Sequence, residues 1–223
     1  MKKALSAIAL TALAPFAANA ATIDWTDWQS YSTGVSTGSA SGTIGSIDVD
    51  FSGNVAFAQT GTGRNYWTEP QAGNEPYTNN SVVDNAPDAA EMIAMSRSGV
   101  TNTVTFSSAV TDPIMAIVSQ GRSYLPVSYD FDRSFNVLSE GRGYWGDGTY
   151  NLLAGDVLQG FELHAVIQFT GTFDALSWEV DRNENWHGFT FGLGEQTAVS
   201  EPSTIAMFSL GLIGLGIMRR RLK

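Results

Sequence analysis

Residues 161–169 read FELHAVIQF, and this stretch decides the fold. Every second residue is apolar, and all the others except Val166 are polar, so one set of side chains faces one way and the other set the opposite way. A period of two is typical of a β-strand with one buried and one solvated face. The residues predicted to share the buried face are Phe161, Leu163, Ala165, Ile167 and Phe169.

The same alternation recurs on both sides of this stretch, in residues 47–51, 103–107, 129–132, 176–181 and 189–193. Glycine- and proline-containing turns separate these segments. The uninterrupted apolar run at residues 114–118 predicts a strand covered on both faces. One or two helical turns are expected within residues 88–96. The pattern predicts an all-β fold, an antiparallel two-sheet sandwich of the jelly-roll or lectin-like type.

The N-terminal residues have the layout of a secretory signal. Lys2 and Lys3 precede an apolar segment at residues 4–16, and Ala18-Asn19-Ala20 offers small residues at a cleavage site. This arrangement is typical of a signal peptide removed by signal peptidase after export. We predict a signal peptide at residues 1–20 and a β-sandwich domain at residues 21–199.

The C-terminal residues 200–223 read SEPSTIAMFSLGLIGLGIMRRRLK. A helix is expected over residues 203–218, because its 14-residue apolar part, about 21 Å long, approaches the roughly 30 Å of a bilayer core. A basic tail, residues 219–223, follows and is expected to stay cytoplasmic. The cationic side chains that would hold it there are Arg219, Arg220 and Arg221.

This C-terminal segment resembles the PEP-CTERM sorting signal, in which a short motif, a transmembrane helix and a basic cluster follow in that order. The matching motif residues are Ser200, Glu201, Pro202, Ser203 and Thr204, with Ser200 where the family usually has its first proline. The resemblance implies recognition by exosortase, a membrane transpeptidase. It also implies export across the inner membrane, an anchored intermediate, and a final place at the cell surface or in the extracellular matrix. A plain C-terminal anchor is the alternative.

The charge of the predicted domain limits its partners. Residues 21–199 contain six arginines, no lysine and 21 acidic residues, a formal charge of −15. Such a body is repelled by nucleic acid, which we therefore exclude as a partner. The chain has no cysteine, which excludes both disulfides and thiol catalysis.

The sequence offers weak candidates for catalysis. Glu162 and His164 lie two residues apart on the expected polar face of a strand, and His187 precedes another strand. We interpret the pair as part of a solvated strand face and His187 as structural, and we name no catalytic residue. The sequence has no Gly-x-Ser-x-Gly motif, no His-Glu-x-x-His motif and no phosphate-binding glycine loop.

Paired aspartates raise the question of a cation. Asp48 with Asp50 and Asp130 with Asp132 lie on polar strand faces, and each pair would need further oxygen ligands for Ca²⁺. Loop carboxylates such as Asp147 and Asp156 could supply these ligands. We interpret the pairs as solubilising charge and expect no metal or cofactor, with Ca²⁺ kept as an option.

Aromatic residues in glycine- and asparagine-rich turns are the best indication of a binding site. Flat rings stack on sugar faces, while neighbouring charged groups hydrogen-bond to hydroxyls. Trp178, by contrast, alternates with apolar residues and is expected in the core. The candidate glycan-contacting residues are Trp67, Arg142, Tyr144, Trp145 and Asp147.

Two functions from different classes remain. The first is a non-catalytic exported protein of the cell surface or matrix that associates with exopolysaccharide or another glycan. The second is a secreted polysaccharide hydrolase or lyase, with the same aromatic residues lining a cleft. Ice binding needs a flat threonine array that the short Ser-Thr-Gly repeat does not supply.

Overall fold

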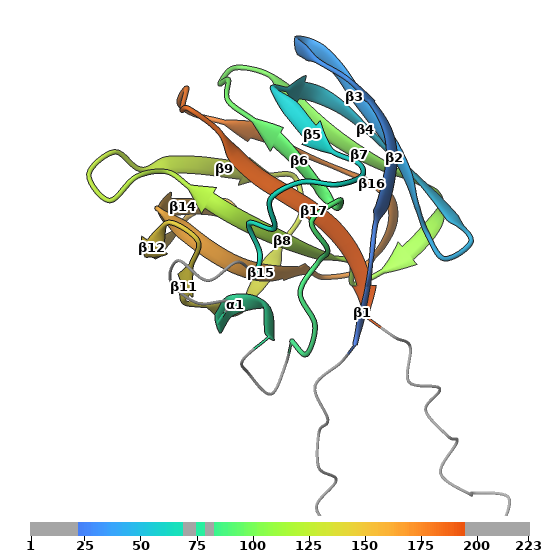
Figure 1. Cartoon of the computed structure of the whole chain (residues 1–223). Coiled ribbons are helices and arrows are strands. Elements are labelled where there is room, and N and C mark those ends of the chain that lie inside the picture. The colour runs from blue at the N-terminus through green and yellow to red at the C-terminus, as the bar shows by residue number, and fades with distance from the viewer. Residues whose placement is uncertain (1–21, 69–74, 79–82, 195–223) are drawn as a thin grey trace, which may run out of the picture.

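A computed structural model describes residues 22–68, 75–78 and 83–194 (Figure 1). In these residues almost all regular structure is β, and every pairing between strands is antiparallel. The all-β antiparallel fold is therefore confirmed. Two large sheets face each other across one core, as in a sandwich, while the jelly-roll subtype stays a prediction.

The first sheet has seven strands. It passes through β10 (Phe135–Glu140), β15 (Leu163–Phe169), β8 (Ile114–Gln120), β17 (His187–Gly194), β6 (Met92–Met95) and β5 (Phe57–Gln59), and β1 (Ile23–Trp25) also pairs with β17.

The second sheet has eight strands. It passes through β13 (Thr149–Leu153), β14 (Val157–Phe161), β9 (Val127–Phe131), β16 (Thr172–Val180), β7 (Thr101–Thr111), β4 (Ile47–Val55), β3 (Gly34–Ile44) and β2 (Asp27–Ser32). Two smaller elements complete the described structure, a hairpin of β11 (Arg142–Gly143) with β12 (Gly146–Asp147) and the helix α1 (Glu75–Thr78).

The core between the sheets is aromatic. Trp178 of β16 is 1% exposed and lies 5.2 Å from Phe189 of β17 and 5.8 Å from Phe51 of β4, measured between ring centres. The core position of Trp178 is confirmed, and the inward residues are those that the alternation predicted, except for Phe161, which is half-buried and lies outside the core cluster. Burial of such large side chains supplies the main stabilisation of the sandwich.

A second apolar layer covers the outer face of the seven-stranded sheet. Trp67, Tyr77 and Val83 pack there against outward residues of β8 and β15, among them Val118 and Val166. The run at residues 114–118 is thus buried on both faces, as predicted. The prediction of a solvated face on residues 161–169 is wrong, because Trp67 and Tyr77 cover it.

The stretch FELHAVIQF also forms two strands instead of one. Phe161 ends β14 in the eight-stranded sheet, and Leu163 begins β15 in the seven-stranded sheet. Glu162 stands between them with a φ of 63°, in the left-handed region that a residue with a side chain rarely adopts. The chain therefore crosses from one sheet to the other at Glu162.

The helical turns expected within residues 88–96 are not formed. Residues 92–95 are the strand β6, and all four are buried. Ile93 and Met95 face the core between the sheets, whereas Met92 faces the outer apolar layer. A short apolar run buried on both faces has no period that separates strand from helix, which explains the error.

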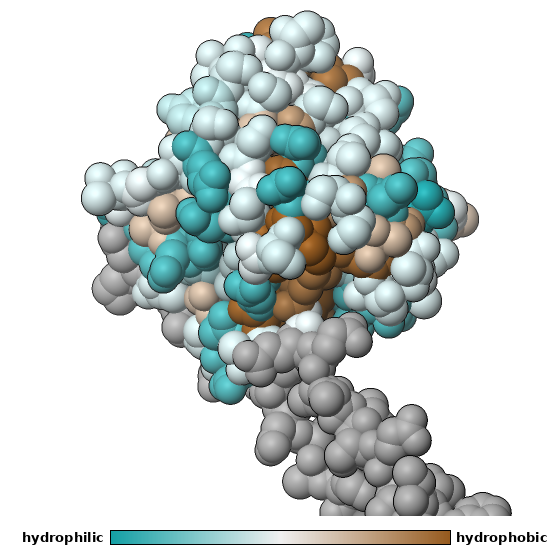
Figure 2. All heavy atoms as spheres, turned by 90° about the vertical axis from the view of Figure 1, so that its right-hand side faces the viewer, coloured by the Kyte–Doolittle hydropathy of each residue, from teal (hydrophilic) through white to brown (hydrophobic). Residues whose placement is uncertain are grey.

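The two ends of the described body lie side by side, because Ile23 of β1 pairs with Gly194 of β17. A groove of about 250 Å³ lies near this end, lined by Ile47, Ala109, Val110, Thr111, Leu193 and Gly194. Figure 2 views the molecule from this side and shows an apolar strip between polar side chains.

The predicted signal peptide, the helix at residues 203–218 and the basic tail lie outside the described residues. In the described ranges, no helix has the length and apolar character needed to cross a bilayer.

Candidate functional site

A bulge in β8 prepares the candidate site. Leu163 pairs with Gln120 and Ala165 with Ile117, so Val118 and Ser119 together lie opposite His164. Ser119 has a φ of 59°, a left-handed conformation that a bulge with an extra residue can require. The bulge ends the regular pairing and changes the direction of the side chains that follow.

A pocket of about 280 Å³ opens beside this bulge and the corner at Glu162. Among the described residues, four that are not glycine have a positive φ, and two of these, Ser119 and Glu162, line the pocket. Sparsely populated backbone conformations cluster at functional sites, where the surrounding structure holds them. The full lining is Ser119, Arg122, Trp145, Glu162, Glu184, Asn185 and Trp186.

Glu162 is half-buried, and the hydroxyl of Ser119 donates to its Oε1 at 2.5 Å. Burial raises the pKa of Glu162 above its ordinary value, and the negative charge of Glu184 adds to the rise. The hydrogen bond from Ser119 and the charge of Arg122 act in the opposite direction. The pocket therefore holds a carboxyl group whose ionised form is disfavoured.

Glu184 is the second acidic group, and its side chain is only 5% exposed. The backbone N–H of Gly121 donates to its Oε2 at 2.9 Å, and Arg122 Nε lies 4.0 Å from its Oε1. His187 Nδ1 is 3.3 Å from Oε2, within ion-pairing distance but outside hydrogen-bond geometry. Glu184 is therefore fixed by several neighbours on the pocket floor.

Buried polar residues lie behind Glu184. The ring of Tyr129 is 5.2 Å from that of His187, and the amide of Gln120 donates to the carbonyls of Val127 and Leu158 in the opposite sheet. Tyr129 Oη, Gln120 Oε1 and both ring nitrogens of His187 have no hydrogen-bond partner among the described residues. Such unpaired buried atoms are rare, and four of the six found among the described residues belong to these three side chains.

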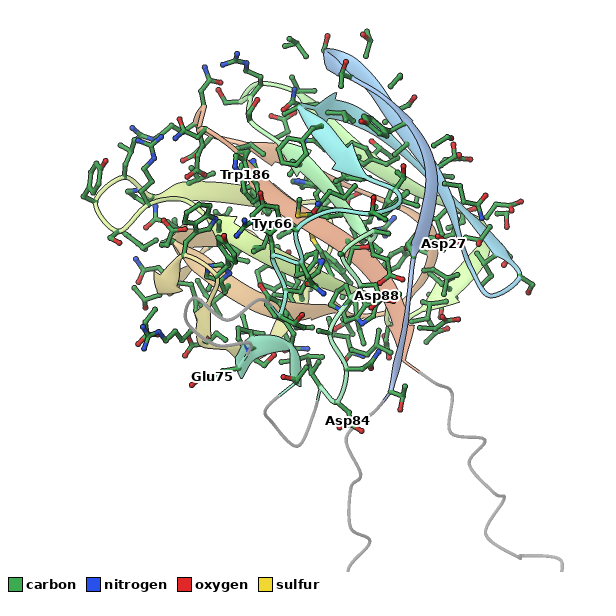
Figure 3. The ribbon with its side chains drawn as sticks, in the orientation of Figure 1. Asp27, Tyr66, Glu75, Asp84, Asp88 and Trp186 are labelled. Carbon is green, nitrogen blue, oxygen red and sulfur yellow. The ribbon has the colours of Figure 1, made fainter. Side chains whose placement is uncertain are left out.

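Aromatic rings form one wall of the pocket. Trp145 is 50% exposed, and its ring lies 6.4 Å from Trp186 and 4.8 Å from Tyr144. Tyr66 lies 4.9 Å from both Trp186 and Tyr144, so the four rings form a connected cluster. Figure 3 shows Tyr66 and Trp186 together, away from the end at which β1 pairs with β17.

The β11–β12 hairpin carries Trp145 to the pocket, and two glycines let the hairpin lie against the sheet. A Cβ atom on Gly143 would come within 2.2 Å of the His164 ring, and one on Gly148 within 1.9 Å of the Glu162 carbonyl oxygen. Any side chain at either position would push the hairpin away. Glycine is therefore required at both positions to place Trp145.

His164 supports the hairpin from below. Its Nε2 accepts a hydrogen bond from the Trp145 backbone N–H at 3.4 Å, and its Nδ1 lies 3.3 Å from the Tyr77 hydroxyl. That hydroxyl donates to the carbonyl of Ile117 at 2.6 Å, so the proton of the neutral imidazole belongs on Nδ1. Burial lowers the pKa of His164 to about 4.

This lowered pKa predicts a loss of stability in weak acid. The unfolded chain takes up a proton at His164 near the ordinary pKa of about 6.5, whereas the folded protein takes it up only near pH 4. The free energy of unfolding should therefore fall by about 3 kcal/mol as the pH drops from about 6.5 to about 4. Denaturant titrations at several pH values measure this change.

The variant His164→Gln provides the comparison, because it removes this titration and keeps an amide in the cavity. Other groups, such as Glu91, whose pKa burial raises to about 7, titrate in both proteins. The difference between the two pH profiles therefore isolates His164. Identical profiles in the wild type and the variant would rule out its contribution.

The predicted glycan-contacting residues are only partly brought together. Trp145 lines the pocket, and Tyr144 supports it but is 6% exposed, its hydroxyl accepting from Arg64 Nη1 at 2.7 Å. Arg142 and Asp147 are exposed and face each other across the hairpin, outside the lining. Trp67 is 1% exposed in the outer apolar layer, so it is not part of an exposed face.

The sequence interpretation missed the acidic pair. Glu162 was assigned to a solvated strand face, and Glu184 was not singled out. The only local signal for the second group is the composition of residues 183–187, Asn-Glu-Asn-Trp-His, just before a strand.

The aspartate pairs interpreted as solubilising charge lie on the surface. Asp50 accepts from the Ser41 hydroxyl at 2.6 Å, and Asp132 from the Ser177 backbone N–H at 2.9 Å. Within residues 22–68, 75–78 and 83–194, no three His, Cys, Asp or Glu side chains are grouped to hold a metal ion.

Comparison with known proteins adds one finding, at the C-terminal end of the chain. The PEP-CTERM protein-sorting motif matches residues 198–221. The chain carries a PEP-CTERM sorting signal. This confirms the resemblance noted from the sequence, and the motif implies export, membrane-associated sorting to the cell surface and recognition by exosortase. No curated protein and no solved structure matches the chain.

Proposed function

We propose that this PEP-CTERM protein is a non-catalytic component of the cell surface or extracellular matrix that binds a glycan, such as an exopolysaccharide, in the pocket at Trp145. The observation that carries the proposal is a half-exposed tryptophan ring beside charged side chains already fixed by the fold. Ring faces stack on the C–H faces of sugars, and the charged groups of Glu184 and Arg122 are placed to hydrogen-bond hydroxyls.

The pocket is prepared before any ligand arrives. Ser119 holds Glu162, Gly121 and Arg122 hold Glu184, and neighbouring rings hold Trp145. Side chains fixed in this way lose little conformational entropy on binding. A weak stacking contact then suffices for measurable affinity.

The position of the pocket also suits a sorted protein. Its residues Glu184, Asn185 and Trp186 immediately precede β17, whereas the sorting motif follows the other end of this strand. At 3.3 Å per residue, β17 separates the two ends by about 23 Å. The pocket thus opens at the end of the sandwich away from the point where the described body leads into the sorting signal.

Replacing Trp145 with alanine should weaken glycan binding about fivefold, which corresponds to about 1 kcal/mol for one stacked ring. The melting temperature should stay nearly unchanged, because the ring is half exposed. A glycan array with the full chain in detergent micelles identifies a ligand, and titration of the wild type and the variant with that oligosaccharide gives the two affinities.

Tyr31→Ala is the matched control, because Tyr31 is 45% exposed on the edge strand β2, outside the pocket lining. This variant should bind like the wild type. Equal affinities of the wild type, Trp145→Ala and Tyr31→Ala for the oligosaccharide would show that the pocket is not the binding site. A large drop in the melting temperature of Trp145→Ala would show that the ring is structural.

The acidic pair favours hydrolysis of a glycosidic bond as a second candidate. Glycosidases use two carboxyl groups in different environments, one that donates a proton and one that stays ionised. Glu162, with its raised pKa, fits the first role, and Glu184, which Gly121 and Arg122 contact, is the second carboxyl group in the same pocket. Release of reducing ends from a bound polysaccharide, lost in Glu162→Gln, would support this activity; their absence in the wild type would exclude it for that substrate.

A further inference from the structure

The charge of the pocket narrows the class of glycan. We propose that the pocket selects sugars that carry a free, protonated amine, so that its ligand is an amino-sugar polymer and not a neutral or uronic-acid polymer. This inference rests on the proposed glycan-binding function and assigns its substrate class. The charged lining residues that support it are Glu162, Glu184 and Arg122.

The positive charge in the lining is already engaged. Arg122 Nε lies 4.0 Å from Glu184 Oε1, and among the described residues that line the pocket this arginine alone is cationic. Glu162 instead has the uncharged hydroxyl of Ser119 as its hydrogen-bond donor. When Glu162 is ionised, the lining therefore has one negative charge more than it has positive charges.

The electrostatic surroundings of Glu162 also favour a cation. Glu184 lines the same pocket, and its negative charge raises the pKa of Glu162. A half-buried carboxylate gains most from an opposite charge that arrives without much water around it. An ammonium group on a bound sugar would supply that charge, whereas a neutral sugar would leave Glu162 uncompensated.

The aromatic wall provides a second, independent attraction. Trp145 and Trp186 line the pocket together with the two acids, and Tyr66 and Tyr144 extend the ring cluster. Aromatic faces attract cations through their quadrupole, and tryptophan does so best. Carboxylates and indole rings in one pocket therefore recognise the same group, an amine on an otherwise sugar-like ligand.

The charge of the whole body acts in the same direction. Residues 21–199 have a formal charge of −15 and contain no lysine. Such a body attracts a polycation at a distance and repels a polymer of uronic acids. This long-range electrostatic attraction does not show where on the protein a ligand binds, but it disfavours anionic polysaccharides as ligands.

The experiment compares two oligosaccharides of the same linkage and length, a β-1,4-glucosamine hexamer and a β-1,4-glucose hexamer. They differ only at the C2 substituent. Titration of the full chain in detergent micelles, at one near-neutral pH for both hexamers, should give an affinity at least about tenfold higher for the glucosamine hexamer. Glu162→Gln, which keeps the size and the Ser119 contact, should abolish most of this preference.

Asp174→Asn is the matched control, since it removes one exposed negative charge on β16, outside the pocket lining. This variant should keep the preference. If the glucosamine hexamer binds all three proteins equally well, attraction is spread over the acidic surface, and the assignment to the pocket is overturned.

Failure of the inference and failure of the proposed function have different results. Equal affinity for the two hexamers, both weakened by Trp145→Ala, would overturn the amine selectivity and keep the glycan site. Absence of binding of either hexamer and of every glycan on the array would overturn both. A preference for the glucose hexamer would contradict the charge argument directly.

Discussion

Replacing Trp67 with alanine should lower the free energy of unfolding by about 3–5 kcal/mol, the range measured for loss of a fully buried large aromatic side chain. The ring is 1% exposed and packs edge-on against Tyr77 with 5.2 Å between ring centres. It belongs to the layer that covers β8 and β15, so its removal leaves a cavity over the seven-stranded sheet. Chemical denaturation of the full chain in detergent, followed by circular dichroism, measures the loss.

Trp145→Ala is the matched control, because the same atoms are removed from a ring that is 50% exposed. Its cost should stay below about 1 kcal/mol. Equal losses for the two variants would contradict the assignment of Trp67 to a buried layer and Trp145 to an exposed wall. Together the two variants separate the structural tryptophan from the binding tryptophan.

Loss of Trp67 should also reach the candidate site. Trp67 contacts Tyr77, and Tyr77 contacts His164, whose Nε2 accepts from the backbone of Trp145. This chain of contacts links the outer layer to the hairpin that carries the pocket wall. The outer apolar layer therefore buries the outer face of the seven-stranded sheet and also helps to position the hairpin that carries Trp145.

Period-two patterns predicted the inner faces of the sheets well. Val49 and Phe51 point inward on β4 while Asp48 and Asp50 stay exposed, and Trp178 occupies the centre of the core. This success has a simple cause. In a strand with one solvated face, polar and apolar residues alternate, so the sequence itself shows which side chains face the core.

The outer face of the seven-stranded sheet could not be predicted in this way. The run at residues 114–118 indicated that something covers it, but not which segment. The residues that cover this face include Trp67 and Tyr77. They are distant in sequence from residues 114–118, and their sequence neighbourhood is rich in turn-forming residues. Glycine and asparagine next to an aromatic residue indicate that the local backbone forms a turn. They do not indicate which part of the protein the aromatic ring packs against.

The pocket could not be predicted from the sequence for a different reason. Its acidic groups come from a corner between sheets at Glu162 and a loop before β17 at Glu184. Apolar alternation continues across Glu162, so the pattern suggested one strand where there are two. The left-handed conformation that turns the chain there, and the bulge opposite His164, are set by tertiary packing and leave no period to detect.

Substituting alanine for both Glu201 and Pro202 should make a longer, membrane-retained form accumulate in a host that carries exosortase. These residues lie within the matched PEP-CTERM motif at residues 198–221, and the motif implies recognition by that enzyme. Removing the charge and the proline leaves the apolar run and its basic residues unchanged, so membrane insertion should persist while processing fails. Immunoblots of membrane and released fractions give the ratio of the two forms.

A second variant separates processing from orientation. Neutral residues in place of Arg219, Arg220 and Arg221 should impair the orientation of the segment, because cytoplasmic retention depends on those charges. Protease accessibility of a C-terminal tag in spheroplasts reports that orientation, and the Glu201 and Pro202 variant should match the wild type in this assay. Unchanged maturation of the Glu201 and Pro202 variant would mean that the segment acts as a plain anchor, despite its match to the sorting motif.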